Sequence, residues 1–346
     1  MANLKEYSGL TTKIRAMRGQ LIKKEEYIKL AELSTISEFV EHLKKYKGYQ
    51  DIFEGVNTEQ IHRGTLEKIM SYSVYKDFSK IYKFSNINQR KFLKLYFIKY
   101  EISVIKRAIR SVGTGEKFTG TDKAYDIFCN YSDIDISSIN SAKTIDGIIE
   151  KLKGTIYYES LVLVSGYTQK SIFDYEMALD VFYFSYFWKK RRSFKGSELK
   201  NIINFIGTEI DSLNVLWIYR AKKYYRLSPA QIYSMIIPVN YKLKKEMIIS
   251  LVESQEMTDF NAELEKIPFL NKMGKEKEAG GLQNLEESYT RLVKRLNHKF
   301  FTMDPYSLAC INVYLYDKNE EIVKLIKIAE SIRYGYKADI IRAEII

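Results

Sequence analysis

The residues whose types and spacing best suit binding chemistry form a run of four cations, Lys189-Lys190-Arg191-Arg192. The run follows an aromatic stretch that ends at Trp188. Aromatic rings beside cations can stack nucleobases while the cations hold phosphates. The same pairing suits lipid headgroups or an acidic partner. A third interpretation is a buried helix with a solvated end, whose cations meet the carbonyl end of the helix dipole. The run therefore predicts either a binding surface or a plain helix end.

Groups suited to catalysis or metal binding are sparse. The segment Gly113–Gly120 is rich in glycine but lacks the Gly-Lys-Ser/Thr that lets a phosphate loop reach phosphate and Mg²⁺. His42, His62 and His298 are scattered without metal-ligand spacing. No Gly-x-Ser-x-Gly turn presents a serine nucleophile. The sequence thus predicts no catalytic residue, no metal site, no cofactor and no enzymatic activity.

The composition favours a helical, water-soluble chain. Only 4 of the 346 residues are proline, so little interrupts a helical hydrogen-bond ladder. The longest apolar stretches, Met177–Trp188 and Ile202–Tyr219, are broken by acids and are too short to span a bilayer. The formal charge of +12 fits nucleic acid or anionic lipid as a partner, and equally a well-solvated surface.

One pattern of apolar residues occurs three times. Each copy places them at positions −7, −4, −3 and 0 relative to an anchoring leucine, which is one face of an amphipathic helix. The anchoring leucines are 109 and then 112 residues apart. Such a period predicts a repeated helical unit. The copies are Ile36, Phe39, Val40, Leu43, then Ile145, Ile148, Ile149, Leu152, and then Met257, Phe260, Asn261, Leu264, where Asn261 is the one polar substitution.

Three acids repeat with the same period. Glu101, Asp211 and Glu321 are 110 residues apart, and each precedes a strongly apolar stretch. A carboxylate in the first turn of a helix meets unpaired N–H groups and the positive end of the dipole. We therefore expect each acid to lie at the start of a helix and to have a structural role.

The order of several motifs resembles that of a known family. Near the start, Tyr7 precedes a helix-like segment, Lys13–Arg18, that contains Arg15. Later, Gly207–Asn214 is similar to a Glu-x-Asp-x-x-Asn helix, and Tyr219–Lys222 to its arginine-bearing end, which here is Arg220. The segment Ile237–Leu243 is close to an Ile-Pro-x-Gly motif, with Asn240 in place of the glycine. The chain resembles the C subunit of the V/A-type (vacuolar/archaeal) rotary ATPases, which is called the d subunit in the eukaryotic V-ATPase.

The resemblance implies an all-α fold of three similar helical domains, arranged as a funnel with pseudo-threefold symmetry. On this basis the units are 1–112, 113–226 and 227–346, and the N-terminal helix packs near the C-terminal unit. The family's role implies a non-catalytic central-stalk protein on the cytoplasmic face of the membrane. It would be a socket that couples the rotating shaft, made of the D and F subunits, to the proteolipid (c/K) ring during ATP-driven proton or sodium transport or ATP synthesis.

The candidate partner-binding residues combine both lines of inference. The resemblance adds Arg15 and Arg220 to Trp188, Lys189, Lys190, Arg191 and Arg192. Lipid headgroups are a further possible contact, and no nucleic acid is expected. The alternative is a helical-repeat protein that binds nucleic acid or acts as a scaffold. Against it, the basic residues are spread along the chain and do not form one long stripe.

Overall fold

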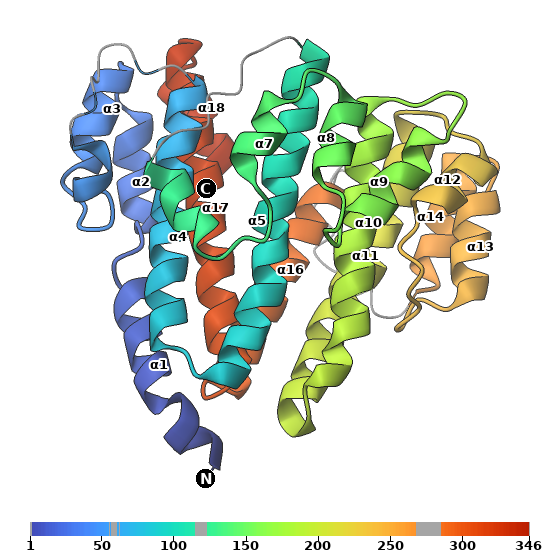
Figure 1. Ribbon diagram of the computed structural model, residues 1–346, viewed down its shortest axis with the longest axis horizontal. Coiled ribbons are helices and arrows are strands. Elements are labelled where there is room, and N and C mark those ends of the chain that lie inside the picture. Colours follow the sequence, from blue (N-terminus) through green and yellow to red (C-terminus); the bar gives the residue numbers. More distant parts are fainter. Residues whose placement is uncertain are drawn as a thin grey trace. The chain divides into compact units, whose positions relative to one another are not determined.

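The computed structural model describes residues 2–54, 56, 61, 63–114, 123–267 and 285–345. Every regular element in this part of the chain is a helix, which confirms the all-α expectation (Figure 1). None of these helices combines the length and apolar character needed to cross a bilayer. The glycine-rich loop considered for phosphate binding lies outside the described residues, except for Gly113 and Thr114, which end a helix.

The chain forms two compact units. Unit 1 comprises Met1–Lys94, Gly120–Asp133 and Asp304–Ile346, and unit 2 comprises Leu95–Thr119 and Ile134–Met303. The division into three units remains a prediction. The helices of unit 1 are α1 (Ala2–Arg18), α2 (Lys24–Ala31), α3 (Ile36–Leu43), η1 (Gln50–Phe53), α4 (Arg63–Phe84), the beginning of α5 (Ile87–Thr114), α6 (Lys123–Cys129), α17 (Leu308–Arg333) and α18 (Ala338–Ile345).

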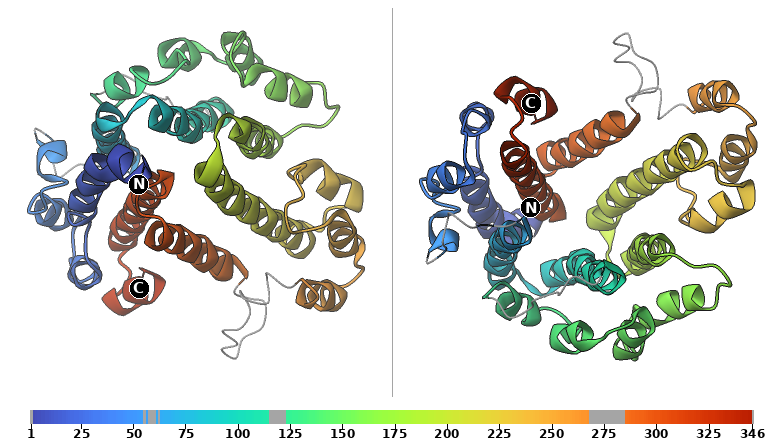
Figure 2. Two further views of the ribbon diagram at one scale, coloured as in Figure 1. Left: turned by 90° about the horizontal axis from the view of Figure 1, so that it is seen from below. Right: turned by 90° about the horizontal axis from the view of Figure 1, so that it is seen from above.

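Helix α17 is the centre of unit 1, because α1, α2, α3 and α4 all pack against it. Figure 2 shows α1 and α17 side by side from both ends. Side chains of α17 such as Ile311, Leu315 and Leu325 are fully buried, as are Ile14 of α1 and Phe78 of α4. Burial of this apolar surface is the main force that holds segments from both ends of the chain together.

Unit 2 is built around α11. This 28-residue helix contacts α10, α12, α13 and α16. Its buried residues Val215, Leu216 and Ile218 join Leu251 and Phe260 in one apolar cluster. The helices of unit 2 are the remainder of α5, α7 (Ile136–Ser141), α8 (Ile145–Lys151), α9 (Tyr158–Ser165), α10 (Ile172–Lys190), η3 (Arg191–Ser193), α11 (Gly196–Lys223), α12 (Pro229–Met235), α13 (Lys245–Glu253), α14 (Met257–Glu265) and α16 (Leu285–Met303).

The three copies of the apolar pattern are the short helices α3, α8 and α14, as predicted. Each helix begins at the first residue of its copy. Thr35 and Thr144 cap α3 and α8 by accepting a hydrogen bond from a backbone N–H of the first turn, and Glu256 begins a capping box on α14. The anchoring leucines Leu43, Leu152 and Leu264 are all buried.

The expected position of the three acids was wrong. Glu101, Asp211 and Glu321 lie in the middle of the long helices α5, α11 and α17, more than three turns after each helix begins. Each of these residues is at most 6 % exposed. The dipole at a helix start therefore cannot account for them, and their partners must be sought in the surrounding structure.

Candidate functional site

The basic run lies where α10 ends and α11 begins. A reciprocal capping box between Ser171 and Asp174 starts α10, and the helix ends at Lys190, where the short helix η3 takes over. Lys189, Lys190 and Arg192 are exposed. Their positive charges stand beside the carbonyl end of α10, where the helix dipole favours cations. This end of α10 therefore presents three exposed cations to solvent.

Arg191 and Trp188 contact one another. The guanidinium carbon of Arg191 is 3.7 Å from the centroid of the Trp188 ring, and Arg191 also donates a hydrogen bond to the Trp188 carbonyl oxygen. Tyr241 packs against Trp188 at 6.2 Å between ring centroids. Burial lowers the pKa of Arg191, and the neighbouring charge of Arg192 lowers it further. Because Arg191 and Tyr241 both pack on the indole, Trp188 presents less free ring area for stacking a nucleobase.

The two arginines chosen from the resemblance differ in their surroundings. Arg15 is exposed on α1. Arg220 is half-exposed near the end of α11, and its Nε donates to a carboxylate oxygen of Glu286 on α16 at 2.7 Å. That interaction raises the pKa of Arg220 and lowers that of Glu286. Arg220 thus joins two helices of unit 2, whereas Arg15 remains accessible.

Two of the motifs that carry the resemblance bind each other. Asn214 accepts a hydrogen bond from the backbone N–H of Ile237 at 2.9 Å and donates to the Ile237 carbonyl oxygen at 3.1 Å. The Asp211 carboxylate accepts hydrogen bonds from three consecutive backbone N–H groups at 3.2, 2.6 and 2.9 Å. The donors are Tyr241, Lys242 and Leu243. Side chains of α11 therefore hold the segment that leads into α13.

The same segment explains a glycine of α11. A Cβ added to Gly207 would lie 2.5 Å from the ring of Tyr241, which is closer than Cβ atoms normally approach another heavy atom. Tyr241 also donates from its hydroxyl to Asn204 Oδ1 at 2.5 Å. Gly207 thus lets the Tyr241 ring lie directly on the helix, and Tyr241 in turn supports Trp188.

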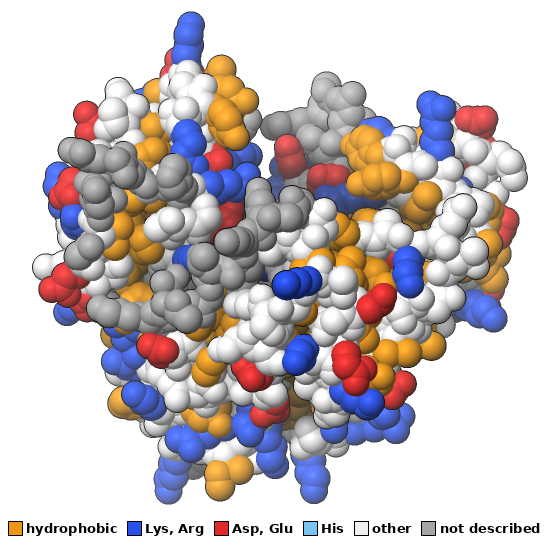
Figure 3. Space-filling model, turned by 45° about the horizontal axis from the view of Figure 1, so that its top comes forward, with side chains coloured by type: hydrophobic (Ala, Val, Ile, Leu, Met, Phe, Trp, Pro, Cys, Tyr) orange, Lys and Arg blue, Asp and Glu red, His pale blue; other side chains and the backbone are white. Residues whose placement is uncertain are grey.

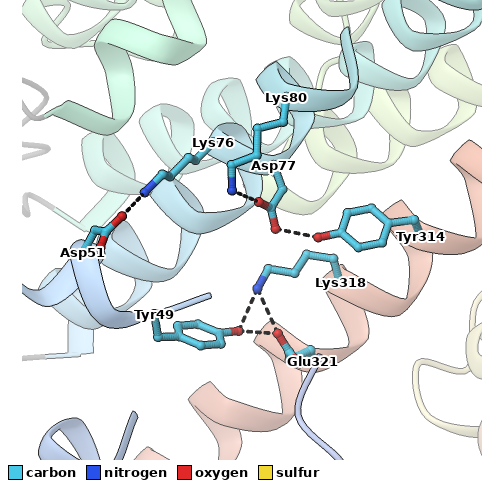
Figure 4. Close-up of polar contacts among 8 residues, drawn as sticks. All are labelled: Tyr49, Asp51, Lys76, Asp77, Lys80, Tyr314, Lys318 and Glu321. Carbon is cyan, nitrogen blue, oxygen red and sulfur yellow. Dashed lines mark hydrogen bonds and ion pairs between the residues drawn. The ribbon is translucent and has the colours of Figure 1, made fainter. Parts of the chain in front are cut away.

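Glu321 is the equivalent acid of unit 1, and it organises a buried polar cluster (Figure 4). Tyr49 donates from its hydroxyl to Glu321 Oε1 at 2.5 Å, and Lys318 Nζ lies 2.8 Å from the same oxygen. The other carboxylate oxygen accepts from the backbone N–H of Ile22 at 2.6 Å. Lys318 and Glu321 side chains are each only 2 % exposed. The acid of α17 therefore binds both segments that flank α2 and α3.

The chemistry of this cluster is that of a fixed ion pair. Burial raises the pKa of Tyr49 well above its ordinary value, and the Glu321 carboxylate adds to the effect. The hydroxyl consequently stays protonated and can donate. Nearby, Asp77 of α4 accepts from Tyr314 at 2.6 Å and from Lys80 at 2.9 Å (Figure 4). These contacts hold α4 and Tyr49, the residue before η1, against α17.

The third acid, Glu101 on α5, accepts a hydrogen bond from the hydroxyl of Tyr157. Tyr157 lies 5 residues after Leu152, and Tyr49 lies 6 residues after Leu43, so the two tyrosines occupy similar places after α8 and α3. Asp211 uses backbone donors instead. The three acids thus share one role. Each accepts hydrogen bonds from a segment that lies next to two consecutive short helices, although the donor groups differ.

A fourth acid has a different environment. Glu209 on α11 is half-buried, and burial raises its pKa, while the positive charge of Lys99 acts in the opposite direction. An acid whose pKa is higher in the folded state than in the unfolded state lowers stability as pH rises through the interval between the two values.

We expect Glu209→Gln to remove this pH dependence. Relative to the variant, the native chain should lose free energy of unfolding as pH rises above about 4.5 toward the raised pKa of Glu209, and should not regain it at higher pH. Urea denaturation of both proteins between pH 4 and 8, about the range in which most domains stay folded, measures the difference. Parallel curves for the two proteins would contradict the expectation. Asp146→Asn, at an exposed acid of the same unit, is the control and should not show a pH-dependent difference of this sign.

Sequence reasoning identified the three acids but missed their donors. The available signal was the recurrence of Tyr49 and Tyr157 after an anchoring leucine, because a buried tyrosine hydroxyl needs a hydrogen-bond partner. The backbone donors of Tyr241–Leu243 leave no comparable trace in the sequence, because every residue except proline has an N–H.

Comparisons of the sequence with known proteins identify a family. The family model described as "ATP synthase (C/AC39) subunit" matches residues 10–344. The C subunit of the A-type ATP synthase of Thermococcus kodakarensis is 25 % identical over 343 residues, which cover 97 % of this chain and 89 % of the relative. The corresponding protein of Methanococcoides burtonii is 24 % identical, covering 98 % and 94 %. That of Methanocaldococcus jannaschii is 23 % identical, covering 99 % and 87 %.

Proposed function

The chain belongs to the ATP synthase (C/AC39) subunit family, and from this membership we propose that it is a non-catalytic central-stalk subunit of a rotary ATPase. In this role it is a socket that joins the rotating shaft, made of the D and F subunits, to the proteolipid ring. It lies at the cytoplasmic face of the membrane as a peripheral component. The observation that carries the proposal is the family match over residues 10–344, with relatives named as C subunits of A-type ATP synthases.

The buried polar contacts support a role in transmitting force. A protein that transmits torque must keep its helices in register under force. In unit 1, Glu321 binds Tyr49, Ile22 and Lys318 together, and in unit 2 Asp211 and Asn214 hold the segment between α12 and α13. Packed interiors with satisfied polar groups have low compressibility and transmit strain. These contacts suit a rigid coupling element.

The distribution of charge does not favour nucleic acid as the partner. Figure 3 shows Lys and Arg side chains scattered among acidic and apolar ones over the face that it draws. Several cations of the chain are engaged in ion pairs within it, for example Lys106 with Asp180 and Arg110 with Glu176. A phosphate-tracking surface instead gathers its cations on one face or along one groove.

The exposed arginine of α1 gives a test of partner binding. We expect Arg15→Ala to weaken association with co-expressed shaft and proteolipid subunits by about 2 kcal/mol, or roughly thirtyfold, which is typical of an arginine central to an interface. Its melting temperature should stay unchanged, because Arg15 is exposed. Pull-down titration and thermal unfolding measure the two quantities.

Lys45→Ala, which removes another exposed cation of unit 1, is the matched control and should change neither quantity. Equal association of the native chain and Arg15→Ala would remove Arg15 from the interface. Failure of the native chain to associate with either the shaft or the ring would overturn the proposed function itself. Salt-sensitive binding to RNA or DNA in place of those partners would have the same consequence.

A further inference from the structure

One end of unit 1 exposes several large apolar side chains. Phe84 ends α4 and is 58 % exposed, and Ile87 begins α5 and is 76 % exposed. Leu4 on α1 is 48 % exposed. Figure 1 shows the α4–α5 turn at the same end of unit 1 as the beginning of α1. We call this surface the tip face, and it consists of Leu4, Phe84 and Ile87 together with the cations Lys5, Lys13, Lys83 and Lys91.

Hydrogen bonds make the tip face one continuous surface. Asn86 in the α4–α5 turn donates from Nδ2 to the Glu6 carboxylate of α1 at 2.8 Å, and Gln89 Nε2 donates to the Glu6 carbonyl oxygen at 3.3 Å. Lys13 of α1 stands 5.7 Å from the centroid of the Phe84 ring. The turn and the first half of α1 therefore present their side chains together.

Hydrogen bonds within the α4–α5 turn fix its backbone, so the exposure of its apolar side chains is a property of the folded turn. Asn86 and Gln89 form a reciprocal cap at the start of α5, in which each side-chain oxygen accepts from the other residue's backbone N–H at 2.9–3.0 Å. The Ser85 hydroxyl donates to the Ile81 carbonyl oxygen at 2.8 Å and closes the end of α4. With its polar groups satisfied, the turn holds Phe84 and Ile87 in water.

The chemistry of the tip face matches the boundary of an anionic bilayer. Apolar side chains there can enter the headgroup region by about 5–10 Å, while lysines extend their amines to the phosphates. The tip face carries four lysines, and the acid beside them, Glu6, already accepts a hydrogen bond from Asn86 through its carboxylate. Cations near a negatively charged leaflet are attracted to it, and aromatic residues favour the interface.

We propose that the tip face of unit 1 rests directly on an anionic lipid surface. The contact is additional to any protein partner of this chain and does not depend on the proposed coupling function. Phe84 and Ile87 insert into the headgroup region, and the surrounding lysines pair with lipid phosphates. The arrangement orients unit 1 with the beginning of α1 toward the membrane.

Vesicle sedimentation with the purified full chain tests this proposal. We expect the chain to bind vesicles that contain phosphatidylglycerol. Added salt should weaken this binding, and vesicles of pure phosphatidylcholine should bind the chain more weakly. Ile87→Glu and Phe84→Glu each lower the partition coefficient by about tenfold or more, because a charge replaces an inserted apolar side chain. Lys83→Ala lowers it by about fivefold, as expected for one cation near a charged leaflet.

Matched variants separate the tip face from general positive charge. Leu163→Glu in unit 2, at a side chain that is 69 % exposed, and Lys45→Ala in unit 1 should leave the partition coefficient unchanged. An equal loss for Ile87→Glu and Leu163→Glu would overturn the proposal. A second outcome would also overturn it. If the chain binds the isolated proteolipid ring in detergent through Ile87 but does not bind vesicles, the tip face contacts protein and not lipid. A chain that assembles with the shaft yet ignores vesicles refutes only the lipid contact.

Discussion

Replacing Glu321 with glutamine is expected to lower the free energy of unfolding by about 3–5 kcal/mol, because it leaves the buried ammonium group of Lys318 without a counter-charge. The two side chains are 2.8 Å apart and almost completely shielded from water. The glutamine carbonyl can still accept a hydrogen bond from Tyr49 or Ile22, so the loss comes chiefly from the charge. Urea denaturation followed by circular dichroism measures it.

A second variant identifies the cause of that loss. Lys318→Met combined with Glu321→Gln removes both charges and should recover much of the stability, because replacing a buried ion pair by neutral groups is often tolerated. Glu320→Gln changes the neighbouring, half-buried acid and should alter stability by less than about 1 kcal/mol. A double variant no more stable than Glu321→Gln would show that hydrogen bonding, and not charge pairing, sets the stability of the cluster.

Asp211→Ala should destabilise unit 2 by at least about 2 kcal/mol. Alanine leaves the backbone N–H groups of Tyr241, Lys242 and Leu243 without their acceptor. The bond of Leu243 is buried, so its unsatisfied donor costs about 1–3 kcal/mol, and the two partly buried bonds add less each. Asp211→Asn keeps one acceptor oxygen and should lose less. Amide hydrogen exchange at residues 241–243 reports the loss locally, and urea denaturation reports it globally.

The natural control is an acid that does stand in the first turn of a helix. Asp146 lies in the first turn of α8 and is exposed, so Asp146→Ala should cost only about 0.3–1 kcal/mol through the helix dipole. If Asp211→Ala lowers the free energy of unfolding no more than Asp146→Ala does, Asp211 does not hold the segment 241–243 on α11.

The short helices could be predicted closely because their signals are local. An amphipathic spacing and a preceding Thr35 or Thr144 cap are both contained within a dozen residues, and α3 and α8 begin where the pattern begins. Ser228 and Pro229 likewise mark the start of α12, as cap and first residue. In these cases local preference and tertiary packing agree.

The long helices show why the acids were misplaced. The apolar stretch after Glu101 indicates where α5 has buried residues such as Ile105 and Ile109, but α5 begins at Ile87, in a polar segment with a weaker pattern. A helix start is set by caps such as Asn86 and Gln89, whereas an apolar run reports burial. The contact of Asp211 with three backbone amides depends on tertiary structure, which side-chain spacing does not encode.

The residue types of the candidate binding site could be predicted from the sequence, but the contacts that these residues make could not. A run of cations at a helix end is visible in the sequence, and three of its four members are exposed. The stacking of Arg191 on Trp188 depends on the local turn at the end of α10. The ion pair of Arg220 with Glu286 joins segments that are 66 residues apart and meet only in the folded chain. The tip face escaped notice because Phe84 and Ile87 are ordinary apolar residues until their exposure is known.

The packing of α17 at the centre of unit 1 has a consequence for biosynthesis. Tyr49 and Glu321 are 272 residues apart, and Thr11 and Pro305 are 294 apart, so the N-terminal helices cannot complete their contacts until α17 has left the ribosome. At typical elongation rates this interval lasts on the order of ten seconds or more. The contacts of Glu101 and Asp211 in unit 2 span only 56 and about 30 residues and can form earlier. The nascent chain thus emerges with its first helices waiting for a partner, and during that interval their apolar faces are open to chaperones or to aggregation.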